Sequence, residues 1–363
     1  MAGTGSELVM KKTATFLCSI LCCTVAFAQM VIDGVRLEPP RQDGIWVRPA
    51  QDTPSMAVWG FADGIRVGIN PPGRPRGLLD IYAPYLGAGD MNIINFIAME
   101  PIVASSQNRG YSELESSALD GVQGKQFRSS DTPERPATWD KLHPARGTVA
   151  VEDGKQTLTV WIFCEKFDNG ADVYVRLRFI EGSPYQFELQ AFASAQSAPL
   201  DKFILTATMG NKMRLRRLYA ADGVTKLSYD LWPDYRDKWF TPYEYTFLKD
   251  MVRDRNGGAW VLAYPTETEA DYQNAVYEEG TFKGWDYKGI PATQYWYCPL
   301  PQDEMYSVVN GRYTYWAILK TIPGGIAFEN FELVEPFRQG AVYYFGIDPD
   351  KPAKIIKRIN RIK

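Results

Sequence analysis

Alternation of polar and apolar residues, repeated along most of the chain, is the feature that most restricts the fold. The segments 157–163 (Thr-Leu-Thr-Val-Trp-Ile-Phe) and 172–179 (Asp-Val-Tyr-Val-Arg-Leu-Arg-Phe) put every second side chain on one face of an extended strand. Similar segments occur at 64–69, 77–82, 185–192, 202–209, 213–219, 260–264, 313–319, 328–334 and 341–347. Strands with one polar face favour antiparallel sheets that pack face to face. The sequence therefore predicts an all-β protein, a large antiparallel β-sandwich of the supersandwich or jelly-roll type.

Turn-forming residues separate the predicted strands. They occur at 182–184 (Gly-Ser-Pro), 222–223 (Asp-Gly), 256–258 (Asn-Gly-Gly) and 310–311 (Asn-Gly). One short helix is expected at 266–275, with Thr266 as its N-cap and Glu269 three residues later. The polar, proline-containing stretch 129–145 marks a weak boundary. We expect one β-sandwich domain over 29–363 rather than two independent domains.

The N-terminal segment has the pattern of a secretory signal peptide. Lys11 and Lys12 precede an uncharged run at 13–26 that is too short to span a bilayer, and Ala-Phe-Ala follows at 26–28. This pattern predicts cleavage after Ala28 and a secreted or periplasmic protein. A signal peptide of this kind would begin at Met10, so the residues before Met10 are additional to it. No later segment is long and apolar enough to be a transmembrane helix.

A lipoprotein is the alternative interpretation of the same segment, because cysteines at 18, 22 and 23 could carry a lipid. Lipid modification requires a small residue immediately before the cysteine. Leu17, Leu21 and Cys22 occupy those places, so cleavage after Ala28 is favoured.

Charge and histidine content exclude several classes of function. The net charge is −3 over 363 residues, which argues against a nucleic-acid partner. His143 is the single histidine and lies in a turn-like sequence, where we expect a surface residue. A Ser-His-Asp triad or a zinc site with several imidazoles is hard to build from one histidine. Proton transfer would then fall to carboxylates, tyrosines, lysines and arginines.

Two cysteines, Cys164 and Cys298, remain after the predicted cleavage. In an oxidising compartment they could form one disulfide that closes a long loop, worth about 3–5 kcal/mol. They could equally be two buried thiols that pack as small hydrophobic residues. The sequence leaves both alternatives open.

The first candidate site is a group of acids in the N-terminal third. Glu113 and Glu115 are two positions apart, so a strand would put both on one face, and Glu100 is a further candidate. Paired carboxylates acquire separated pKa values and can act as acid and base in glycoside hydrolysis. Asn95 and Arg109 would orient substrate hydroxyls. The alternative is that these acids lie on a solvated strand face or hold a structural cation.

The second candidate site is aromatic. Trp232, Tyr235, Arg236 and Trp239 lie in a segment with two prolines, and Trp285 lies in a second cluster. Sugar rings stack on Trp and Tyr while their hydroxyls bind charged groups, so these five residues are predicted to bind substrate. Core packing is the alternative role for the rings.

No cofactor is predicted, apart from a structural Ca²⁺ that Asp230, Asp234 and Asp237 could hold through hard oxygen ligands. Their spacing fits no EF-hand loop, so a solvated acidic loop is the favoured interpretation.

Two stretches resemble known groups of proteins. Motifs at 64–68 (Gly-Ile-Arg-Val-Gly), 82–87 (Tyr-Ala-Pro-Tyr-Leu-Gly), 95–101 (Asn-Phe-Ile-Ala-Met-Glu-Pro) and 112–115 (Ser-Glu-Leu-Glu) resemble an uncharacterised group of secreted proteins from polysaccharide-degrading bacteria. The segments 328–337 and 343–346 are similar to the closing strands of galactose-mutarotase-like β-supersandwiches. The first likeness implies no known activity. The second implies a β-supersandwich fold, but the histidines on which mutarotases rely are missing.

These features together predict a secreted carbohydrate-active enzyme, and a glycoside hydrolase is the leading hypothesis. A polysaccharide lyase that uses Tyr235, Arg236 and Lys238 is an alternative. A non-catalytic glycan-binding protein is another. The hydrolase reading predicts that Glu113 and one of Glu100, Glu115 or Glu329 line the same pocket as Trp232 or Trp239. The oligomeric state is not predicted.

Overall fold

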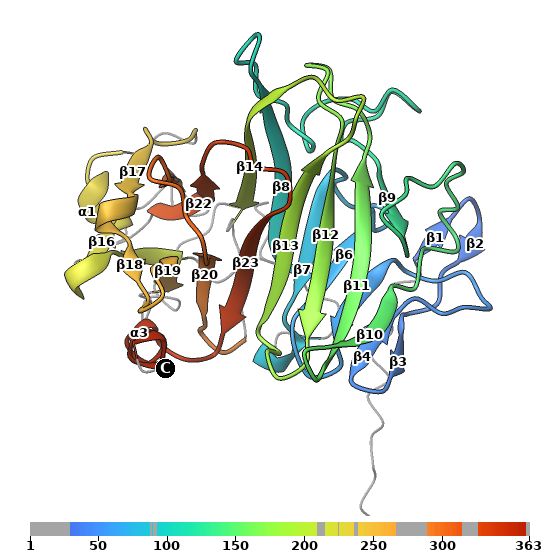
Figure 1. Cartoon of the computed structure of the whole chain (residues 1–363), viewed down its shortest axis with the longest axis horizontal. Coiled ribbons are helices and arrows are strands. Elements are labelled where there is room, and N and C mark those ends of the chain that lie inside the picture. Colours follow the sequence, from blue (N-terminus) through green and yellow to red (C-terminus); the bar gives the residue numbers. More distant parts are fainter. Residues whose placement is uncertain are drawn as a thin grey trace, which may run out of the picture.

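The computed structural model describes residues 30–87, 89, 93–208, 215–223, 225–235, 239–265, 289–313 and 326–360, and all that follows concerns these residues. It confirms the all-β prediction. Two large antiparallel sheets stack as a sandwich, and Figure 1 shows β11, β12 and β13 lying over β6 and β7. The described residues contain no helix that is long and apolar enough to cross a membrane.

The first sheet has ten strands in the order β17-β21-β22-β14-β8-β7-β6-β5-β4-β3. Its strands are β3 (Arg41–Asp43), β4 (Trp46–Arg48), β5 (Val58–Phe61), β6 (Arg66–Ile69), β7 (Leu78–Tyr82), β8 (Ile93–Val103), β14 (Leu200–Thr208), β17 (Glu244–Phe247), β21 (Tyr306–Tyr313) and β22 (Ile326–Val334). The N-terminal strands therefore lie in the same sheet as strands from the C-terminal third.

The second sheet has eleven strands, with a main path β10-β11-β12-β13-β23-β20-β19-β15-β16; β9 pairs with β11 and β18 with β19. Its strands are β9 (Phe127–Ser130), β10 (Thr148–Glu152), β11 (Lys155–Cys164), β12 (Val173–Ile180), β13 (Gln186–Ala193), β15 (Leu215–Tyr219), β16 (Thr225–Leu227), β18 (Val252–Arg253), β19 (Ala259–Pro265), β20 (Thr293–Cys298) and β23 (Ala341–Asp348). A separate hairpin joins β1 (Val31–Ile32) and β2 (Val35–Arg36).

Helical turns are few among the described residues. They are α1 (Ser228–Leu231), α3 (Pro352–Ile359) and the 3₁₀ turns η1 (Pro84–Leu86), η2 (Ala221–Gly223) and η3 (Leu248–Asp250). Helix α3 was not predicted from the sequence, since it is two turns long and buries only one side, at Ile355 and Ile359. The predicted helix 266–275, and the predicted strand 313–319 beyond Tyr313, lie outside the described residues.

The core lies between the two sheets. The ring centroids of Phe61 on β5 and Phe179 on β12 are 5.9 Å apart, and the Trp296 indole of β20 donates a hydrogen bond to the carbonyl of Phe331 on β22. One buried cluster takes residues from before and after the stretch 129–145, among them Trp59 and Val160. The two sides of this stretch therefore share one core.

One predicted turn is wrong. Asn310 and Gly311 do not end a hairpin but lie inside β21, where the ladder with β22 shifts by one residue. Asn310 pairs with Asn330 and Gly311 with Phe328, which leaves Glu329 as the extra residue of a β-bulge. A Cβ on Gly311 would lie 2.8–2.9 Å from Ile326, Ala327 and Trp232, so only glycine fits here. This bulge sets the direction of Glu329.

The two cysteines are buried free thiols, so of the two alternatives the structure has the unbridged one. Burial raises the pKa of Cys298 to about 12 and the pKa of Cys164 well above its usual value. Because the thiolate is the reactive form, we expect neither to be alkylated in the native protein and both after denaturation. Peptide mass mapping after iodoacetamide treatment measures this; a disulfide-linked peptide pair would contradict it.

Candidate functional site

Glu100 lies on the outer face of the ten-stranded sheet. On β8 the neighbouring Met99 points into the core, so strand alternation turns Glu100 outward. On the next two strands Thr206 and Glu332 are paired opposite each other and face the same way. All three side chains are nevertheless buried, with exposures of 8% or less. A layer of side chains therefore covers this part of the sheet.

Arg109 joins these residues into one network. Its bridge with Ile102 places it beside the end of β8. The guanidinium donates to Glu100 through Nε (2.9 Å) and Nη2, to Glu332 Oε1 (2.7 Å) and to Thr206 Oγ1 (3.1 Å). Arg109 and Glu332 are 223 residues apart in the sequence. The first carboxylate pair, Glu100 and Glu332, is thus held by a single arginine.

The charges in this network oppose one another. Burial raises the pKa of Glu100, the positive charge of Arg109 lowers it, and the negative charge of Glu332 raises it. The two carboxylates also raise the pKa of Arg109, so the guanidinium stays protonated. Because Glu100 and Glu332 share the positive charge of one arginine, this pair is suited to binding and positioning rather than to proton transfer.

A second carboxylate pair, Glu113 and Glu329, lies on the same side of the molecule. Glu113 is in the turn that follows Arg109, and Glu329 is the bulge residue of β22. The negative charge of Glu113 raises the pKa of Glu329, so an acid from the N-terminal third lies within electrostatic reach of one from the C-terminal third. The Arg312 guanidinium lies 3.8 Å from Glu329 Oε1.

The carboxylates of the second pair have less positive charge beside them than those of the first pair. Burial raises the pKa of Glu113. Burial also raises the pKa of Glu329; Arg312 lowers it, and the Glu113 charge raises it further. The Glu329 side chain is 12% exposed. A carboxyl group in these surroundings retains its proton at higher pH than usual, as a general acid must.

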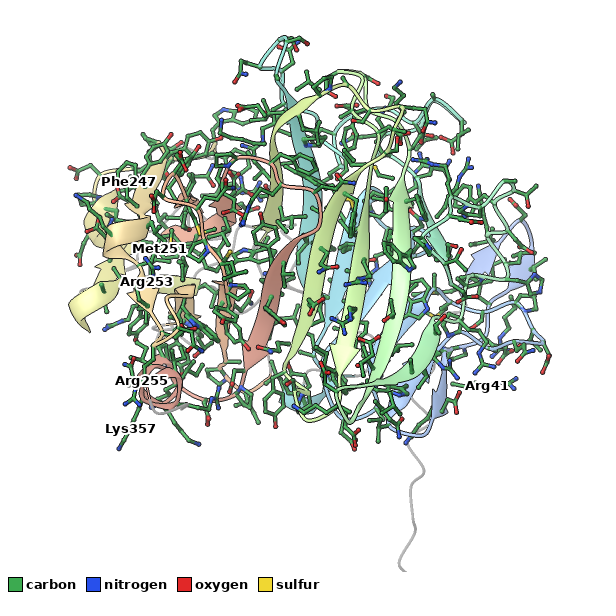
Figure 2. All side chains as sticks on the ribbon, viewed as in Figure 1. Arg41, Phe247, Met251, Arg253, Arg255 and Lys357 are labelled. Atoms are coloured by element: carbon green, nitrogen blue, oxygen red, sulfur yellow. The ribbon has the colours of Figure 1, made fainter. Side chains whose placement is uncertain are left out.

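Beside the first pair runs an aromatic strip, formed by Tyr243, Tyr245 and Phe247 on and just before β17 and by Tyr306 on β21. Tyr245 and Phe247 stack at 6.4 Å and 15°, and Tyr245 lies 5.8 Å from Tyr306. Tyr243, Tyr245 and Phe247 are 51%, 46% and 53% exposed. Strand β17 is the edge of the ten-stranded sheet, and Phe247 projects at that edge of the molecule in Figure 2.

The strip and the acids are neighbours. Burial raises the pKa of Tyr243, and the charges of Glu332, Arg109 and Glu100 act on it as well. Arg109 also lies 5.5 Å from the ring centroid of Tyr111. The outer face thus presents carboxylates, arginines and exposed rings together, which is the set of groups that a saccharide site needs.

Several residues singled out from the sequence have other roles. Asn95 is wrong as a substrate ligand: it points between the sheets, is buried, and its Nδ2 donates to Gln294. The strand predicted for Glu113 and Glu115 is a turn. Glu115 accepts hydrogen bonds from the backbone of Tyr111 and Asp168 and pairs with Lys125, so it braces this turn.

The aromatic residues that were predicted to bind substrate lie in different surroundings. The Trp232 ring packs edge-on against Phe328 at 6.0 Å and lies partly buried against the core, so its described contacts are those of a packing residue. The Tyr235 hydroxyl donates to the carbonyl of Phe240 and closes its own loop. Trp239 is 65% exposed. Its neighbour Phe240 lies under Arg312, 5.9 Å from the guanidinium, which connects this loop to the second carboxylate pair.

Several predicted features lie outside the described residues or away from the two carboxylate pairs. Arg236, Asp237, Lys238 and Trp285, like the predicted signal peptide, lie outside the described residues. Within the described ranges no group of three or more potential metal ligands gathers. His143 is exposed, as predicted, and its Nδ1 lies 2.9 Å from Asp140.

Glu332, Arg312 and the β17 aromatic strip were not among the site residues predicted from the sequence. The alternation of 328–334 predicts that Glu332 faces away from the core, but its partners are too distant in sequence to be recognised. Comparison of the chain with protein-family models, curated proteins and solved structures finds no match.

Proposed function

We propose that the outer face of the ten-stranded sheet binds a glycan and cleaves it as a glycoside hydrolase. The observation that carries this proposal is the second carboxylate pair: Glu113 and Glu329, brought together from distant parts of the chain and partly buried. Glycoside hydrolysis needs two such groups, one to protonate the leaving oxygen and one to act on the sugar or on water.

Their surroundings divide the two roles. Glu329 is buried and lies beside the charge of Glu113, so it retains its proton and acts as the general acid. Glu113 then ionises first and acts as the base or nucleophile. Arg312 lies within ion-pair distance of Glu329 and directs its carboxyl group. The leaving oxygen takes the proton from Glu329 as the glycosidic bond breaks.

Binding falls to the neighbouring groups. The exposed faces of Tyr245 and Phe247 would stack on the C–H faces of sugar rings. Arg109, fixed by the first pair, would donate hydrogen bonds to sugar hydroxyls, and the Tyr243 hydroxyl would exchange hydrogen bonds with them. Export through the predicted signal peptide would place such an enzyme among polysaccharides outside the cell.

A panel of neutral and acidic polysaccharides tests the class of reaction. We expect new reducing ends to appear without absorbance from an unsaturated uronate. Such absorbance would establish a lyase instead, and binding without any product would establish a glycan-binding protein. The aromatic strip gives the binding protein its support, because its rings lie open on an edge strand.

The charge of Arg312 gives a prediction for the pH profile. Arg312 lowers the pKa of Glu329, so Arg312→Gln should raise it. Since the general acid works while protonated, the alkaline limb of kcat/KM should move to higher pH. Arg312→Lys, which keeps the charge, is the matched control and should leave the limb in place. A limb that moves to lower pH in the Gln variant would contradict the assignment of Glu329.

A further inference from the structure

The opposite side of the sandwich carries a second aromatic row. Trp260, Tyr297 and Tyr344 pair across β19, β20 and β23 of the eleven-stranded sheet. Trp260 and Tyr297 stack at 4.1 Å and 19°, and Tyr297 and Tyr344 at 5.4 Å and 28°. All three are half-buried on the outer face. The Tyr344 hydroxyl donates to Glu188, which continues the row onto β13.

A cavity of about 500 Å³ opens at the end of this row. Its walls are the hairpin turn at 182–186, the turn at 254–256, the rings of Trp260, Tyr295 and Tyr297, and Arg358 of α3. These segments come from four separate parts of the chain. A ring system with a cavity beside it suits a ligand that stacks on one side and is enclosed on the other.

The acids of this cavity are already bound. Asp254 accepts hydrogen bonds from the backbone of Asn256 (2.9 Å) and Gly258 (2.8 Å) and from the Trp260 indole (3.2 Å), which fixes the indole ring. Asp348 accepts from the Asp350 backbone and from Arg358. Neither carboxylate is left to repel an anion at full strength.

Three basic side chains at this end of the molecule have few partners, and Arg255 among them lines the cavity. Arg253 donates to the Gly257 carbonyl and to no described acid. The side chains of Arg255 and Lys357 have no hydrogen bond or ion pair with the described part of the chain. Figure 2 shows all three at the same end of the molecule.

We propose that this cavity binds an oligosaccharide that carries carboxylates, with a sugar ring against the part of Trp260 that lines the cavity and a carboxylate against Arg255. Because Tyr297 and Tyr344 stack in a row with Trp260, they hold the indole in place. Contact with the indole supplies affinity for a sugar ring, and the Arg255 guanidinium selects an anion. The site lies on the other sheet from Glu329, so it would hold a polymer without taking part in cleavage. It stands on its own contacts and does not depend on the proposed hydrolase activity.

Titration of the full chain with an oligogalacturonate tests this site, with a neutral cello-oligosaccharide as the comparison. Hydrogen–deuterium exchange should show protection at 254–260 and at 295–297 with the acidic ligand only. Arg255→Gln should weaken this binding about tenfold, the loss expected for one charge-assisted hydrogen bond. Arg41→Gln, an exposed arginine at the opposite end in Figure 2, is the matched control and should leave it unchanged.

Two results would overturn the proposal: equal protection by the neutral ligand, or unchanged affinity in both Arg255→Gln and Trp260→Leu. Glu113→Gln separates this site from the proposed active site. Because Glu113 lies in a turn that does not line this cavity, its replacement should leave protection at 254–260 intact. Loss of that protection in Glu113→Gln would show that only one glycan site exists.

Discussion

Glu329→Gln is expected to lower kcat by about 10²–10⁴-fold, the usual contribution of general acid–base catalysis. The amide has the same shape as the carboxyl group but cannot deliver a proton to the leaving oxygen. Glu113→Gln should cause a loss of similar size, because the second carboxylate then cannot activate water or attack the sugar. Steady-state rates on the substrate found by the panel measure both.

Glu115→Gln is the matched control for this pair. Glu115 is two positions from Glu113, but its oxygens bind the backbone of Tyr111 and Asp168. It should therefore keep most of the turnover, even if the turn loses some stability. Turnover that survives in Glu113→Gln and Glu329→Gln but is lost in Glu115→Gln would contradict the assignment.

Arg109→Met should lower the free energy of unfolding by about 3–5 kcal/mol at neutral pH, because removing one partner of a buried ion pair leaves uncompensated charge. Here two acids, Glu100 and Glu332, lose their shared cation at once. Urea unfolding of the variant and the wild type measures the difference. A loss under about 1 kcal/mol, as for an exposed ion pair, would show that the network does not stabilise the fold.

The pH dependence of that loss has a definite sign. Arg109 lowers the pKa of Glu100 in the folded protein, so its removal raises this pKa further above the value in the unfolded chain. A raised carboxyl pKa favours the folded state at low pH, and this stability disappears as pH rises through the folded pKa. The loss of unfolding free energy in Arg109→Met should therefore be smaller at acid pH and increase towards neutral pH. Arg109→Lys, which keeps the charge, should recover part of it.

Strand alternation predicted the class of fold, because in a sandwich the period of two decides which face is buried. The same rule applied strictly would have removed Asn95 from the site, since Asn95 and Glu100 are an odd number of positions apart on β8 and face opposite ways. It failed for Glu113 and Glu115, where the chain turns instead of extending. Sequence spacing is informative only after the local backbone is known.

The meeting of distant segments could not be predicted. Glu332 becomes a site candidate only when β22 lies two strands from β8, with β14 between them. The direction of Glu329 depends on a bulge at Gly311, whose Asn-Gly sequence is typical of a turn. The packing of the Trp232 ring on Phe328 could not be predicted for a related reason, since it depends on how the Trp232 loop meets β22.

A crystal structure of Glu329→Gln with the oligosaccharide that the wild type cleaves tests the central claim most directly. We predict a sugar ring against Tyr245 or Phe247 and a glycosidic oxygen within hydrogen-bond distance of the amide at 329, with Glu113 on the other side of the bond. An oligosaccharide seated away from Glu113 and position 329 would contradict the proposed active site.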